Sequence, residues 1–135
     1  MRKLIVVLSL LTVGVVLQSM QTPNAASVAR GKALYAQYCM SCHQADGAGA
    51  PRMTPPLGKT DYVTGDKARL IGIVLKGLNE PLEVNGEEYF NPMASFAHMN
   101  DQQIADVLTY VRNSFGNKAS AIKPAEVKAQ RAKIK

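Results

Sequence analysis

Residues 39–43 read CMSCH, and these five positions decide how the rest of the chain is interpreted. Cys39 and Cys42 are separated by two residues, and His43 follows the second cysteine directly. This C-x-x-C-H spacing is typical of the covalent attachment of a c-type haem. The two thiols would add to the two vinyl groups of one porphyrin, and the adjacent imidazole would bind the iron as proximal ligand. The motif occurs once, so we expect one covalently attached haem c per chain.

Other uses of paired cysteines fit the sequence less well. A structural zinc site needs about four cysteine or histidine ligands, and outside the motif the chain offers only His98. A thioredoxin-like dithiol occurs within a strand–helix–strand pattern, and the sequence around the cysteines does not indicate one. A thiol–disulfide protein that uses Cys39 and Cys42 nevertheless stays open as an alternative.

The N-terminal stretch has the pattern of an export signal. Arg2 and Lys3 precede an apolar run from Leu4 to Leu17. As a helix this run would be about 21 Å long, which is shorter than the roughly 30 Å hydrocarbon core of a bilayer. We therefore expect residues 1–26 to be a signal peptide or a retained N-terminal anchor. Export predicts a periplasmic protein, and retention would anchor it to the inner membrane.

The positive charge of the chain is concentrated outside its centre. The 135 residues carry a net charge of +6, and a chain of this length has room for one domain. Residues 27–117, the expected domain, hold eight Lys and Arg against nine Asp and Glu. Residues 118–135 hold six basic residues against one acid and few large apolar side chains, so we expect a flexible basic tail. A nucleic-acid partner is disfavoured, because the basic residues lack interleaved aromatic residues.

Apolar spacing predicts three main helices joined by long loops. The first would start with Ser27 as its cap and run through Tyr38 into the cysteines. A second helix would follow Asp66, and a third would follow Asn100, where Gln103 completes a capping box. Residues 44–60 are rich in glycine and proline and are expected to form a loop. Asn85-Gly86 predicts a short hairpin between residues 82 and 89.

Over residues 28–117 the sequence resembles class I c-type cytochromes of the small bacterial type. Gly31 and Tyr35 stand eight and four residues before the first cysteine, as in that family, where the first and last helices cross. Residues 106–111, DVLTYV, match the family's last helix, with Val107 and Tyr110 as the facing pair. The resemblance implies an all-α cytochrome c fold, with three main helices and long loops wrapped around one covalently bound haem.

The resemblance also implies roles for individual residues. The family has a Pro-x-Leu loop after the haem motif, and Pro55 and Leu57 match it here. The resemblance implies that the carbonyl of Pro55 accepts a hydrogen bond from His43 and that Leu57 covers the haem. The family pattern Val-Asn-Gly, Tyr and Met, which begins at residue 84, places the distal iron ligand at Met93. The proline that commonly follows this methionine is Ala94 here, so the loop departs from the pattern.

Several assignments remain open beside these. Met99 and His98 are alternative distal ligands. A further alternative is a distal position that no residue of the protein fills. Tyr62 and Arg52 are candidates for contacts with the haem propionates.

With both axial positions filled by protein, no substrate would reach the iron. We therefore expect an electron carrier and not an enzyme, which passes single electrons between redox partners through an exposed haem edge. The partners would be a donor and an acceptor such as a dehydrogenase, an oxidase or a reductase, and the chain could be a haem subunit of such a complex. The alternative is a haem protein with a labile distal site that acts in peroxidase-like chemistry or gas sensing.

Overall fold

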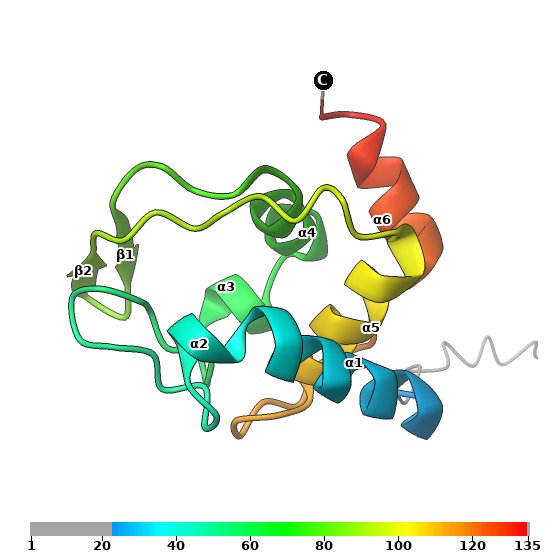
Figure 1. The fold of residues 1–135 in the computed structure, drawn as a ribbon, viewed down its shortest axis with the longest axis horizontal. Coiled ribbons are helices and arrows are strands. Elements are labelled where there is room, and N and C mark those ends of the chain that lie inside the picture. The colour runs from blue at the N-terminus through cyan, green and yellow to red at the C-terminus, as the bar shows by residue number, and fades with distance from the viewer. Residues whose placement is uncertain (1–22, 135) are drawn as a thin grey trace, which may run out of the picture.

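The computed structural model describes residues 23–134, whose helices are joined by long connecting segments (Figure 1). The expected all-α class is confirmed, because the strands are only three residues long. In chain order the elements are α1 (Ala25–Tyr38), α2 (Met40–His43), α3 (Asp61–Thr64), α4 (Lys67–Lys76), β1 (Leu82–Val84), β2 (Glu87–Tyr89), α5 (Asp101–Arg112) and α6 (Pro124–Arg131).

Helices α1 and α5 cross in close contact at Gly31. A β-carbon at this position would collide with the main-chain oxygen of Asp106 and would lie 2.8 Å from the β-carbon of Tyr110. Because glycine has no side chain, the two backbones can approach this closely. One turn further along α1, the ring of Tyr35 packs against that of Tyr110 with 5.5 Å between the centroids. The crossing expected from Gly31, Tyr35 and Tyr110 is therefore confirmed.

A buried carboxylate stabilises the same crossing. Asp106 accepts hydrogen bonds from Arg30 Nε at 2.6 Å, from the Ser27 hydroxyl and from the Gln102 amide. Burial by itself raises the pKa of this carboxyl, but the hydrogen bonds from Arg30, Ser27 and Gln102 outweigh it and hold the pKa below its usual range.

The predicted caps are confirmed at two of the three long helices. The side chain of Asp66 accepts from the Arg69 amide at the start of α4, and Asn100 and Gln103 form a capping box at the start of α5. The prediction is wrong at α1, where Asn24 is the cap and the helix begins two residues before Ser27. Ser27 instead lies inside the helix and turns its hydroxyl towards Asp106.

The predicted hairpin is also confirmed. Strands β1 and β2 pair antiparallel, with Leu82 opposite Tyr89 and Val84 opposite Glu87. Asn85 and Gly86 both have positive φ angles, 54° and 84°, which suit the two-residue turns that join tightly paired strands.

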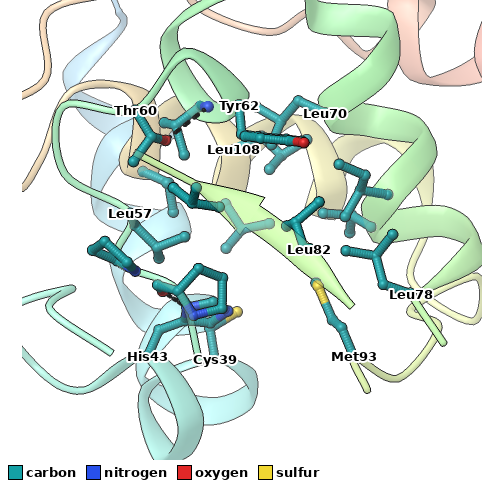
Figure 2. Close-up of a pocket in the computed structure, with 18 of the residues that line it drawn as sticks. Cys39, His43, Leu57, Thr60, Tyr62, Leu70, Leu78, Leu82, Met93 and Leu108 are labelled. Atoms are coloured by element: carbon teal, nitrogen blue, oxygen red, sulfur yellow. Dashed lines mark hydrogen bonds between the residues drawn. The ribbon is translucent and has the colours of Figure 1, made fainter. Parts of the chain in front are cut away.

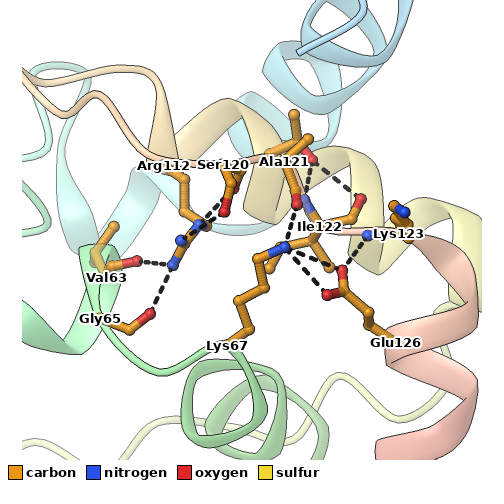
Figure 3. Close-up of polar contacts among 10 residues, drawn as sticks. Val63, Gly65, Lys67, Arg112, Ser120, Ala121, Ile122, Lys123 and Glu126 are labelled. Carbon is orange, nitrogen blue, oxygen red and sulfur yellow. Dashed lines mark hydrogen bonds and ion pairs between the residues drawn. The ribbon is translucent and has the colours of Figure 1, made fainter. Parts of the chain in front are cut away.

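The expectation of a flexible basic tail is wrong for the part of the tail that the structure describes. Residues 124–131 form helix α6, which packs against α4 and α5. Val127 and Ile122 belong to the core, and the Val127 side chain is 0% exposed. Arg131 and Asp101 form an ion pair at 2.9 Å, and Lys67 pairs with Glu126 at 3.1 Å (Figure 3). A few apolar residues and ion pairs thus attach this segment to the domain, although its basic composition alone would predict a solvated tail.

The expected signal peptide or anchor falls mainly on residues 1–22, which lie outside the described part of the chain. Among residues 23–134, no helix has the length and apolar character needed to cross a membrane.

Replacing Val127 by alanine should lower the free energy of unfolding by about 2 kcal/mol, because the lost methyl groups leave a cavity under α6. Denaturant unfolding of the haem-loaded protein, followed by circular dichroism, measures this. Lys128→Ala, at the exposed neighbouring position, serves as control and should stay within about 0.5 kcal/mol of the wild type. Equal stability of Val127→Ala and wild type would show that α6 does not contribute to the core.

Replacing Asp106 by asparagine should cost about 1–3 kcal/mol near pH 7, because the carboxylate loses charge-assisted hydrogen bonds. Since the pKa of Asp106 is lower in the folded protein than the ordinary value of 3.8, its contribution is present above that pH and is lost as the pH falls through the folded-state pKa. The difference in unfolding free energy between wild type and variant should therefore shrink below about pH 4. A difference that does not change between pH 7 and pH 2.5 would contradict this account.

Candidate functional site

An apolar cavity lies between the CMSCH segment, helices α4 and α5, and the hairpin (Figure 2). It consists of an inner part and an adjoining mouth, and the two share lining residues that include Cys39, His43 and Met93. Its remaining inner lining is almost wholly apolar and comes from Pro55, Pro56, Leu57, Thr60, Tyr62, Val63, Leu70, Ile73, Val74, Leu78, Leu82, Val84, Phe96, Met99, Val107, Leu108 and Val111. A flat, largely apolar cofactor matches such a lining better than a polar substrate does.

The two cysteines lie at the mouth of this cavity and form no disulfide. Cys42 is exposed and Cys39 is partly buried, and both line the mouth. Burial raises the pKa of the Cys39 thiol to about 11, with a further contribution from Cys42. Reactive redox thiols instead have lowered pKa values. The thiol–disulfide alternative is therefore disfavoured.

His43 is oriented by its contact with Pro55. The ring Nδ1 lies 3.1 Å from the Pro55 carbonyl oxygen, which can only accept a hydrogen bond. In the neutral imidazole the proton is then on Nδ1, and Nε2 keeps a lone pair for a metal. Burial lowers the pKa of His43, which also favours the neutral ring, although the hydrogen bond to Pro55 acts in the opposite direction. The partner expected for His43 is thus the one that the structure brings to it.

Met93 faces His43 from the opposite side of the cavity, with its sulfur directed inwards (Figure 2). Its main chain is held at the end of α4, where Met93 N donates to Leu78 O at 2.8 Å and Leu78 N donates to Met93 O at 2.9 Å. Gly77 adopts a φ of +76°, and a side chain there would collide with the Met93 carbonyl oxygen. The helix end therefore fixes the position of this methionine.

The alternative distal ligands lie in less suitable places. Met99 is 4% exposed and lines the inner part of the cavity as a member of the core, just before α5. His98 is exposed and packs edge-on against Tyr38 and in a tilted arrangement against Phe96, with 6.0 Å between ring centroids in both cases. It does not line the cavity.

The structure separates the two residues considered for polar contacts with a cofactor. Tyr62 lines the inner part of the cavity, with the Arg69 guanidinium 4.3 Å from the centre of its ring. Arg52 is exposed and lies 5.9 Å from the ring centre of Phe90, outside the lining. Leu57 lines the cavity as expected.

Leu82, Val84 and Thr60 are among the lining residues that were not identified from the sequence. Leu82 and Val84 belong to β1, and their i, i+2 spacing puts both side chains on one face of the strand. That alternation was available in the sequence. The Thr60 hydroxyl accepts from Val63 N as the cap of α3, a role that the loop composition did not indicate.

Comparisons with known proteins identify relatives of this chain. A family model described as Cytochrome c matches residues 28–115. Cytochrome c-552 of Thermus thermophilus is 40% identical over 114 residues, which cover 78% of this chain and 86% of the relative. The cytochrome c subunit of a quinone alcohol dehydrogenase from Gluconobacter oxydans is 36% identical over 91 residues, which cover 66% of this chain and 19% of the relative. The gluconate 2-dehydrogenase cytochrome c subunit of Pantoea cypripedii is 36% identical over 94 residues, covering 67% of this chain and 21% of that subunit.

Proposed function

Because the chain belongs to the cytochrome c family and is an electron carrier rather than an enzyme, we propose that it passes single electrons between redox proteins through one covalently held haem with His43 and Met93 as axial ligands. The observation that carries this proposal is the position of His43 and Met93 on opposite sides of one apolar cavity. The haem would supply the one-electron couple between ferrous and ferric iron.

The residues of the chain divide the work of holding this group. Cys39 and Cys42, at the mouth, would form the thioether bonds. His43, oriented by Pro55, would offer the proximal nitrogen, and Met93 the distal sulfur. Leu57 and Tyr62 would form part of the inner wall against which the haem packs.

The surroundings of the cavity favour a carrier with a high reduction potential. A soft, neutral methionine sulfur stabilises ferrous iron more than a second histidine ligand would. The apolar lining also disfavours the additional positive charge of the ferric state. The two backbone hydrogen bonds between Met93 and Leu78 hold the distal ligand in place, which speaks against the labile site of a peroxidase-like enzyme or gas sensor.

The mouth is where a redox partner would approach. Cys42, Pro92 and Ala94 line it and are exposed, so a partner could come close to the cofactor edge there. Beside it, Met53 and Phe90 are 53% and 48% exposed, and Phe90 N donates to Arg52 O to join the two loops that carry them. Exposed apolar side chains next to a binding site are typical of protein docking surfaces.

The proposed partners are a donor and an acceptor among dehydrogenases, oxidases and reductases, since some relatives are cytochrome c subunits of dehydrogenases. The proposed location is the periplasm, from the export pattern of the N-terminal stretch, and a retained N-terminal segment would hold the protein at the membrane.

Covalent attachment is tested by extraction with acidified acetone, which removes only haem that is not covalently bound. The wild type and Ser41→Ala, a control inside the motif, should keep their haem in the protein fraction. The double variant Cys39→Ala/Cys42→Ala should release whatever haem it binds. Release of all haem from the wild type would refute covalent attachment.

The distal ligand is tested by comparing Met93→Ala with Met99→Ala, a matched loss of a methionine from the same cavity. Ferric haem with a methionine ligand has a weak near-infrared charge-transfer band, which Met93→Ala should abolish while admitting cyanide or carbon monoxide faster. Met99→Ala should keep the band and lose about 2–5 kcal/mol of stability, because it empties a core position. The opposite pattern would reassign the ligand to Met99.

A further inference from the structure

Arg112, the last residue of α5, carries a charge into the protein interior. It is 3% exposed. Its Nη1 donates to Val63 O at 2.6 Å and to Gly65 O at 3.2 Å, and its Nε donates to Ser120 O at 2.8 Å (Figure 3). The remaining contact, from Nη2 to the Ser120 hydroxyl, is long at 3.5 Å. All its partners are thus uncharged oxygen atoms.

Among the described residues 23–134, no carboxylate lies within ion-pair distance of this guanidinium. Three other arginines, Arg30, Arg69 and Arg131, each form an ion pair with an aspartate. Arg112 forms none, and the nearby Glu126 is paired with Lys67. Burial lowers the pKa of Arg112 and Glu126 raises it, but an arginine starts so far above neutrality that it stays charged in a protein.

The charge lies directly behind the inner wall of the cavity. Val63, whose carbonyl accepts the shortest of these hydrogen bonds, also lines the cavity, and so does Val111, the residue before Arg112. Neither valine lines the mouth, so Arg112 stands behind the part of the cavity whose lining does not include Cys42. Another cation on that wall, Arg69 beside Tyr62, is offset by Asp61 and is exposed.

We propose that Arg112 raises the reduction potential of the bound haem through its uncompensated buried charge. This inference rests on the proposed function, because it requires haem in the cavity. The oxidised iron carries one more positive charge than the reduced iron. A cation fixed in the weakly screening interior therefore destabilises the oxidised state more than the reduced state. Exposed charges act much less, because solvent and salt screen them.

The test compares the midpoint potentials of the haem-loaded wild type, Arg112→Gln and Arg112→Lys, measured by spectroscopic redox titration in high salt. Glutamine removes the charge and keeps a hydrogen-bond donor, whereas lysine keeps the charge and loses the fork-shaped geometry. We expect Arg112→Gln to favour the oxidised form at least about threefold more than the wild type does, a fall of about 28 mV for one electron. Arg112→Lys should stay near the wild type.

Lys128→Gln is the matched control, because it makes the same change in net charge on an exposed side chain. Its midpoint potential should differ from that of the wild type by only a small fraction of the shift expected for Arg112→Gln. An unchanged potential in Arg112→Gln with its methionine band intact would overturn the proposal. An equal fall in Arg112→Lys would also overturn it, because geometry and not charge would then be responsible.

A second pair of variants leaves Arg112 in place and decides the matter if Arg112→Gln does not fold. Ser120 is exposed and lies beside Nη2, so Ser120→Asp would bring a carboxylate to the guanidinium, and Ser120→Asn has the same shape without charge. The aspartate variant should have the lower potential of the two, and equal potentials would overturn the proposal. Failure of the proposed function is seen separately, as a wild type without a c-type haem spectrum.

Discussion

The close approach of α1 and α5 at Gly31 is the constraint on which the arrangement of the site depends. Helix α1 ends at Tyr38, and only Cys39 separates it from α2, so its direction fixes where Cys39 and His43 lie. Helix α5 supplies Val107, Leu108 and Val111 to the inner wall of the cavity. A side chain at position 31 would separate the two helices and would move the motif away from the wall that it faces.

Much of the site could be predicted from the sequence, because its signals are local and chemically specific. The C-x-x-C-H spacing identifies three residues at once, and they gather at one cavity. The hydrogen bond between His43 and Pro55, and the position of Met93 opposite, follow from short motifs at fixed offsets. Capping residues and a two-residue turn likewise act within a few positions of the chain, so Asp66, Asn100 and the hairpin were predicted correctly.

The rest depends on contacts between residues that lie far apart in the sequence. The tail looks solvated because its composition is basic, and only the docking of Val127 and Ile122 against α4 and α5 makes it part of the core. Arg112 has the appearance of an ordinary last-turn cation in the sequence, whereas its partners come from residues 63, 65 and 120. Neither charge pattern nor helical periodicity contains such information.

The paired hydrogen bonds between Leu78 and Met93 have a consequence for how this protein can diversify. They close residues 79–92 into a loop whose two ends meet, and within that loop Leu82 and Val84 line the cavity while the turn at residues 85–86 is exposed. Insertions or charge changes at that turn would remodel the exposed surface while Leu82, Val84 and Met93 keep their positions. The exposed turn and the cavity wall can therefore change independently of each other, although they belong to one hairpin.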